Sequence, residues 1–203
     1  IVYRRSLTRF ILIVNASNTQ KDFTWLQEHS TKYPGVTCQD ISDSWALIAL
    51  QGPRSPEIME GLLKESVKDL KRFHFVEVPL LESPGLVART GYTGEDGFEL
   101  IVPVEHVTKV WVLLTELGAV PCGLGARDVL RLEAGLLLHG NEMNISVNPY
   151  EAGLERFVNP DREEYVARKA LCRIRELGSQ RCLVGFTMVG RGIGRRGHPI
   201  TDG

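Results

Sequence analysis

The apolar residues of this chain gather in short runs, and between the runs they recur at helical spacing. Residues 10–14 and 45–51 are nearly continuous apolar stretches with the length of strands. Ile58, Leu62 and Leu63 then follow one another at the spacing of a buried helix face. Strand-like and helix-like segments that alternate in this way predict an α+β fold.

The same pattern predicts the other elements. Further strands are expected at residues 36–41, 73–81, 86–90, 98–102 and 182–189. Helices are expected from Asn18, as the capping residue, to about Ser30, from Arg54 or Ser55 to about Glu65, and at residues 105–117, 126–134 and 163–175. In the first of these helices, we expect Trp25 and Leu26 on the inner face.

One combination of strand and helix occurs twice. The run beginning at Phe10 is followed by a polar cap and a helix that contains Trp25, and the similar run beginning at Phe98 is followed by a cap and a helix that contains Trp111. This repeat predicts a duplicated strand-helix-strand unit whose halves pack around shared antiparallel strands.

Composition fits a folded core. The chain has 203 residues, 43% of them hydrophobic, and a net charge of −1, which excludes intrinsic disorder and argues against a general polyanion binder. No run approaches the roughly 18 apolar residues of a membrane span. The four cysteines lie far apart without a C-x-x-C pair, so we expect reduced thiols and no structural zinc. Both ends look cut, because the chain begins inside a strand and stops at a turn.

The glycine-rich tail matches a nucleotide-binding pattern only in its letters. Gly192, Gly194 and Gly197 form G-x-G-x-x-G after an expected strand, but Pro199 stands where a Rossmann turn needs a helix. The arginines of this tail have no interleaved aromatic residues, which disfavours nucleic-acid binding. A glycine-rich hairpin is the alternative.

The densest candidate site is the glycine-rich loop at residues 89–100. Its glycines bring Tyr92 and several acids together, and the strand that follows directs Phe98 and Leu100 to one side and Glu99 to the other. The alternative is a hairpin turn with solvated acids, among them Asp96.

A second candidate segment lies at residues 121–135, where glycines precede a helix. Arg127 falls in its first turn, where the helix dipole disfavours a cation. This placement suggests that Arg127 is held for an anion or for Asp128, and a surface ion pair is the alternative.

These two segments closely resemble the aminomethyltransferase, or glycine-cleavage T-protein, family. The matching motifs are Gly91-Tyr-Thr-Gly-Glu-Asp-Gly-Phe-Glu99, Gly123-Leu-Gly-Ala-Arg-Asp128 and Leu130-Arg-Leu-Glu-Ala-Gly135. The resemblance implies that residues 1–180 form a folate-binding domain, incomplete at its N-terminus, and that residues 181–203 begin a C-terminal β-barrel domain.

The resemblance also implies which residues bind folate. Glu99 matches the glutamate that binds the pterin, and Tyr92 the aromatic residue of the same loop. Asn15 matches a polar residue at the end of a strand, and Arg127 matches an arginine that contacts folate. Arg195 matches an arginine at the start of the barrel domain.

By the same resemblance, the expected activity is transfer of a one-carbon unit from the aminomethyl-lipoyl arm of the H-protein to tetrahydrofolate, with release of ammonia. The lipoylated H-protein and folate are the expected partners. The expected compartment is the cytoplasm of a bacterium or the mitochondrial matrix of a eukaryote. No metal, nucleic acid or membrane is implied.

Two departures from the family qualify this expectation. The family's acid/base aspartate belongs to an Asp-Asp pair that would lie just before Ile1, so we expect the fragment alone to be inactive or nearly so. Ala167 stands before Arg168 where the family usually has glycine. Two alternatives stay open: another folate-dependent demethylase acting on sarcosine, dimethylglycine or a sulfonium compound, and a non-catalytic folate-binding helper of RNA modification.

Overall fold

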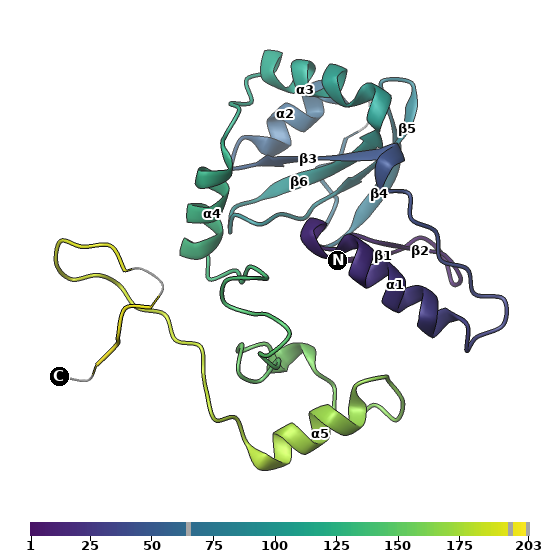
Figure 1. The fold of residues 1–203 in the computed structure, drawn as a ribbon. Helices are drawn as coiled ribbons and strands as arrows, with labels where there is room; N and C mark the ends of the chain where they lie inside the picture. Colours follow the sequence, from purple (N-terminus) through teal and green to yellow (C-terminus); the bar gives the residue numbers. More distant parts are fainter. Residues whose placement is uncertain (64–65, 195–196, 202–203) are drawn as a thin grey trace. The chain divides into compact units, whose positions relative to one another are not determined.

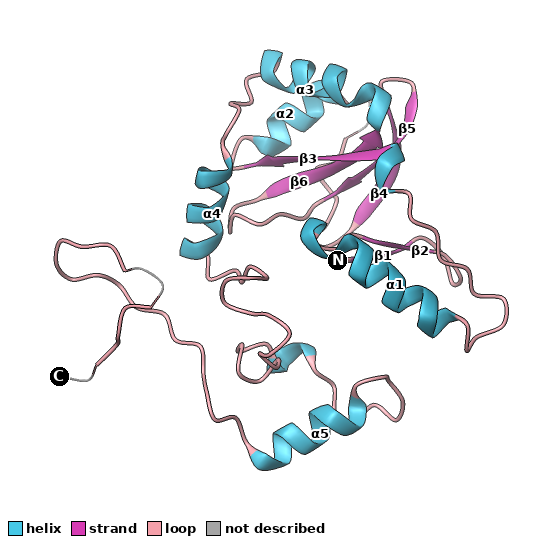
Figure 2. Cartoon of the chain, viewed as in Figure 1, coloured by secondary structure: helices cyan, strands magenta, loops and turns pink. Residues whose placement is uncertain are grey.

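The computed structural model describes residues 1–63, 66–194 and 197–201. Its strands are β1 (Val2–Arg4), β2 (Phe10–Leu12), β3 (Trp45–Gln51), β4 (Phe75–Leu80), β5 (Ser83–Ala88) and β6 (Gly97–Pro103). Its α-helices are α1 (Thr19–Ser30), α2 (Ser55–Leu62), α3 (Val107–Glu116), α4 (Leu124–Glu133) and α5 (Arg168–Leu177). Helices and strands are mixed as Figure 2 shows, which confirms the α+β class.

Two compact units make up the chain, residues 1–136 and residues 137–203. The first unit contains both sheets and helices α1 to α4, and the second contains α5. The expected domain boundary near residue 180 lies inside the second unit and stays a prediction.

The main sheet has four antiparallel strands in the order β3-β6-β5-β4. One face of this sheet packs on helices α2 and α3, as Figure 1 shows. Phe98, Leu100 and Val102 point from β6 into this core and are fully buried, and Met59 of α2 and Val110 of α3 meet them there. Strict alternation along β6 therefore sends the residues between them to the opposite face.

That opposite face is covered in part by a small two-stranded sheet formed by β1 and β2. Tyr3 is the main contact: its side chain is 3% exposed and packs in a cluster with Leu86, Ala88 and Ile101. Its ring also lies 5.2 Å from that of Phe75, at a tilted angle. The N-terminal hairpin is thus attached to the main sheet by side-chain packing.

The expected repeat appears in the order of the elements along the chain, but not in the pairing of their strands. Strand β2 is followed by α1, and β6 is followed by α3, but β2 pairs only with β1 among the described strands. The expectation of shared antiparallel strands was wrong. Trp25 was also misplaced: its side chain is 46% exposed and its ring stacks on His29.

Two expected strands are absent from the described structure. Residues 36–41 and 182–189 have no regular secondary structure. A strand needs a partner edge to satisfy its backbone groups. Apolar and β-branched residues alone do not provide that edge.

Asn18 does stand at the start of α1, as expected, but its side chain makes no capping hydrogen bond.

Candidate functional site

Glu99 lies on the face of β6 that turns away from the helical core. Its side chain is only 8% exposed. Across the ladder it stands opposite Ala88 of β5 on one side and Ala49 of β3 on the other. Ala88 is fully buried, whereas Ala49 is exposed. A buried carboxylate is therefore flanked by two methyl groups, with an open apolar strip beside it on β3, where Leu47 is 42% exposed.

A hydroxyl group holds this carboxylate. Thr90 Oγ1 donates a hydrogen bond to Glu99 Oε2 at 2.5 Å, and the phenol oxygen of Tyr3 lies 3.3 Å from the same Thr90 oxygen. Burial raises the pKa of the Tyr3 phenol above its ordinary value; the hydrogen bond with Thr90 lowers it by less, and the nearby Glu99 charge raises it again. The phenol therefore stays protonated over the physiological range.

The loop between β5 and β6 is organised around the Gln51 side chain. Gln51 Nε2 donates to the carbonyl oxygens of Thr90 and Phe98, each at 3.2 Å. Thr93 Oγ1 donates to Gln51 Oε1 at 3.3 Å. One amide group thus joins the beginning, middle and end of the loop. It fits there because Gly91 and Gly97 have no β-carbon, so their backbone can approach it closely.

Asp96 is part of a structural ion pair. Arg89 donates to both of its carboxylate oxygens, from Nε at 3.0 Å and from Nη2 at 2.6 Å. Arg89 Nη1 also donates to the carbonyl oxygens of Lys68 and Leu70. The expectation that Asp96 is a solvated turn acid was therefore wrong, because a bidentate guanidinium holds the loop to the preceding segment.

This pair makes stability depend on pH in the acid range. The Arg89 guanidinium holds the pKa of the Asp96 carboxyl below its ordinary value. A carboxyl with a depressed pKa in the folded state stabilises the fold above its unfolded pKa and loses that contribution as pH falls. The free-energy difference between the unsubstituted chain and Asp96→Asn should therefore be largest above about pH 5 and shrink toward about pH 2.

Urea unfolding at a series of pH values measures this difference. Asp69→Asn is the matched control, because Asp69 is an exposed carboxylate of the same unit, and its small effect should not follow the same curve. A destabilisation by Asp96→Asn that stays constant from neutral to acid pH would contradict the ion-pair explanation.

Tyr92 and Arg127 come together from different segments. The guanidinium carbon of Arg127 lies 4.8 Å from the centre of the Tyr92 ring, within the range of a cation–π contact. Asp128 instead pairs with Arg131 Nε at 2.8 Å. Of the two partners expected for Arg127, Asp128 is thus engaged elsewhere, and the exposed Arg127 cation lies over an aromatic face.

The other two expected residues lie apart from this loop in the sequence. Asn15 follows β2, and its Oδ1 accepts hydrogen bonds from the amide and hydroxyl groups of Ser17. It caps the short 3₁₀ turn Ala16–Asn18. Arg195 lies outside the described residues.

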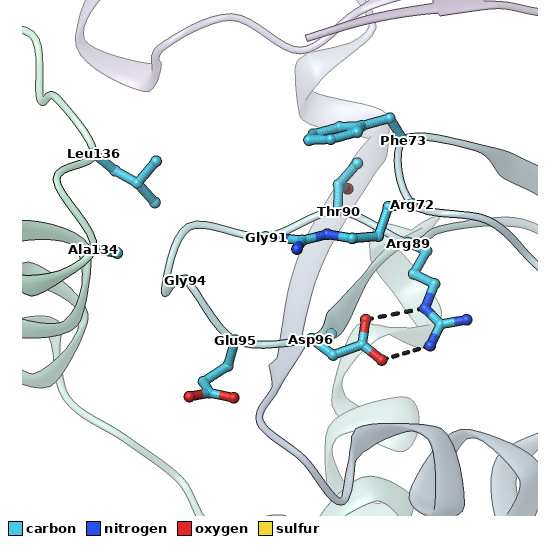
Figure 3. A pocket seen from close by; sticks show the side chains of 11 residues that line it. Arg72, Phe73, Arg89, Thr90, Gly91, Gly94, Glu95, Asp96, Ala134 and Leu136 are labelled. Atoms are coloured by element: carbon cyan, nitrogen blue, oxygen red, sulfur yellow. Dashed lines mark hydrogen bonds and ion pairs between the residues drawn. The ribbon is translucent and has the colours of Figure 1, made fainter.

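A cavity of about 280 Å³ opens beside the same loop. It is lined by Arg72, Phe73, Arg89, Thr90, Gly91, Gly94, Glu95, Asp96, Gly97, Ala134 and Leu136. In Figure 3 the Arg89–Asp96 pair lies at one end of it, and Ala134 and Leu136 lie across from the Gly94 turn. Glu99 and Tyr92 are not among its lining residues; Thr90 is the lining residue that bonds to Glu99.

Sequence reasoning missed Tyr3, Thr90 and Gln51. Tyr3 and Gln51 stand in strands far from the loop in sequence, and no local pattern predicts that their side chains reach it. Thr90 precedes the glycine motif directly, so its place beside the loop was predictable from the sequence, but its hydrogen bond to Glu99 was not.

Among the described residues, no helix is both long and apolar enough to cross a membrane.

Comparison with known proteins places the chain. The family model described as GCVT N-terminal domain matches residues 1–162. An aminomethyltransferase from Caldanaerobacter subterraneus subsp. tengcongensis is 42% identical over 98% of this chain and 54% of its own length. Another from Moorella thermoacetica is 44% identical over 98% of this chain and 56% of its own length.

A solved structure agrees. The crystal structure of glycine cleavage system aminomethyltransferase T from Bartonella henselae matches with a TM-score of 0.79 and 33% identity, over 89% of this chain and 49% of that one. The chain spans about half the length of the relatives it matches. The resemblance seen in the motifs is confirmed, and the chain belongs to the GCVT N-terminal domain family.

Proposed function

We propose that this chain carries the folate-binding part of an aminomethyltransferase of the glycine cleavage system. The reaction would transfer the one-carbon unit of the aminomethyl-lipoyl H-protein to tetrahydrofolate and release ammonia. The observation that carries this proposal is the buried carboxylate of Glu99, bonded to Thr90 and flanked by two alanines. The names of the similar proteins support it.

The chemistry of the ligand fits this carboxylate. The aminopyrimidine edge of a reduced pterin presents two neighbouring N–H donors, and an ionised carboxylate offers two acceptor oxygens. The apolar strip at Leu47 and Ala49, beside the carboxylate, suits the face of a flat heterocycle. A long side chain at position 49 or 88 would fill this space.

Tyr92 and Arg127 serve the rest of the ligand in this proposal. Arg127 is exposed and lies over the Tyr92 ring, which restricts its guanidinium to one side of the loop. A guanidinium held in this way suits the carboxylates of the folate glutamate tail. Asn15 and Arg195 remain proposed folate contacts.

The site's contribution to catalysis would be positioning. Fixing the folate amine next to the aminomethyl carbon can supply part of the roughly 7–11 kcal/mol available to well-oriented reactants. We assign no catalytic acid or base. Asp96 is engaged by Arg89, and Glu95 is an exposed residue of the turn.

Replacing Glu99 by alanine tests the proposal. Isothermal calorimetry should show tetrahydrofolate binding by the chain, and Glu99→Ala should weaken it by about 1–3 kcal/mol, because the donors of the pterin would be buried without a partner. Glu95→Ala, which removes an exposed acid of the same loop, should leave the affinity within about twofold. Equal losses in the two variants would refute the role of Glu99.

The one-carbon donor separates this proposal from its relatives. A folate-dependent demethylase would bind the same folate, so folate affinity does not distinguish the two. Mixing the chain with lipoylated H-protein tests the partner directly, and a complex detected by light scattering would support the aminomethyltransferase. Calorimetric binding of dimethylglycine or sarcosine to the folate-loaded chain would favour the demethylase.

A further inference from the structure

Three buried side chains connect the N-terminal hairpin to the pterin carboxylate. Tyr3, Thr90 and Glu99 are 3%, 6% and 8% exposed. Tyr3 belongs to β1 of the small sheet, Thr90 follows β5, and Glu99 lies in β6 of the main sheet. The oxygens of Tyr3 and Glu99 both contact Thr90 Oγ1.

The chemistry of these groups fixes the direction of both hydrogen bonds. An ionised carboxylate only accepts, so the single proton of the Thr90 hydroxyl is donated to Glu99. The Tyr3 hydroxyl must then donate to Thr90, because the Thr90 oxygen has only lone pairs left to offer. Tyr3 keeps the proton that it donates, because burial raises the pKa of the phenol.

Such a chain restricts a torsion that is otherwise loose. The terminal torsion of a glutamate is broad, so packing alone does not set the plane of its carboxylate. The two alanines that flank Glu99 contribute only methyl groups to that packing. The Thr90 hydroxyl therefore becomes the group that holds the plane, and Tyr3 holds the hydroxyl.

We propose that Thr90 and Tyr3 are positioning residues for folate recognition: they hold the Glu99 carboxylate in the plane in which it accepts both N–H groups of the pterin's aminopyrimidine edge. This inference rests on the proposed function. It assigns these residues no contact with the reacting atoms. Their effect should fall on discrimination of that edge more than on folate binding as a whole.

The test compares two ligands in one assay. Calorimetry with the whole chain measures the affinity ratio between tetrahydrofolate and its 2-desamino analogue, which lacks one of the two donors. The unsubstituted chain should prefer tetrahydrofolate by at least about tenfold. Thr90→Val, which keeps the shape and removes the hydroxyl, should reduce this ratio by roughly tenfold, whereas Thr90→Ser should keep it.

Two further variants separate positioning from folding. Tyr3→Phe keeps the ring packed against Phe75 and removes the donor to Thr90, so it should lower the ratio by roughly threefold. Thr93→Val removes a hydroxyl that bonds to Gln51 in the same loop. It should weaken both ligands alike and leave the ratio unchanged.

Each outcome decides something different. The inference is supported if Thr90→Val reduces the preference for tetrahydrofolate over its 2-desamino analogue and Thr90→Ser keeps that preference. A Thr90→Val variant that keeps the ratio, or weakens both ligands equally as Thr93→Val does, overturns it and leaves the proposed function intact. Absence of tetrahydrofolate binding by the unsubstituted chain overturns the proposed function and this inference together.

Discussion

Replacing Phe98 by alanine is expected to lower the free energy of unfolding of residues 1–136 by about 3–5 kcal/mol. Phe98 is fully buried in the centre of the main core. Its ring is packed between the sheet and helices α2 and α3, and the Arg89 guanidinium carbon lies 5.6 Å from its centre. Removing the ring leaves a cavity that neighbours on a hydrogen-bonded strand cannot fill.

Tryptophan fluorescence measures this change without interference from the second unit. The chain's three tryptophans, Trp25, Trp45 and Trp111, all lie in residues 1–136. Denaturant unfolding followed by their emission therefore reports the unit that contains Phe98, which matters because two units need not unfold in one step.

The control is an exposed phenylalanine of the same unit. Phe73 is 77% exposed, and Phe73→Ala should cost less than about 1 kcal/mol, mainly through its contact with Arg72. If Phe98→Ala were as mild as Phe73→Ala, β6 would not be the centre of the core. The burial of Glu99 beside Phe98 would then lose its explanation as well.

The direction of Glu99 was predictable because it depends only on local geometry. Residues alternate along a strand, so the apolar Phe98 and Leu100 fix the face on which Glu99 lies. The same reasoning placed the strand at residues 45–51 and the helix that contains Trp111 within a residue or two. Patterns of period 2 and 3.6 carry this information in the sequence itself.

The support of the site was not predictable from such patterns. Tyr3 reaches Thr90 across 87 positions, and Gln51 reaches Thr90 across 39. Contacts of this kind depend on how separate elements pack, which periodicity does not record. The strand expected at residues 36–41 does not form for a related reason, because strand-forming residues need the edge of another strand to pair with.

Gly91 and Gln51 form the tightest approach in the loop. A β-carbon built at Gly91 would lie 1.8 Å from Gln51 Oε1 and 2.6 Å from its Cδ. Gly91 is not among the glycines with positive φ, so the obstacle to a larger residue is steric and not conformational. The Gln51 amide can move only by giving up its bonds to Thr90 and Phe98.

Gly91→Ala is therefore expected to destabilise residues 1–136 by about 2–3 kcal/mol, as overpacking and the loss of buried hydrogen bonds combine. Denaturant unfolding followed by tryptophan emission measures it. Gly125→Ala is the matched control. An added β-carbon there meets nothing within 4 Å, and its place inside α4 favours alanine, so this variant should gain up to about 1 kcal/mol.

A double-mutant cycle identifies the cause of the Gly91→Ala effect. Gln51→Ala alone should destabilise by about 1–2 kcal/mol, because it removes the bonds that join the loop. In that background the β-carbon at position 91 finds space, so adding Gly91→Ala should cost less than about 0.5 kcal/mol more. Strict additivity would contradict the clash with Gln51. The structure gives a β-carbon at Gly97 the same neighbour, Gln51, at 2.6 Å, so the Gln51 amide is what requires glycine at both positions.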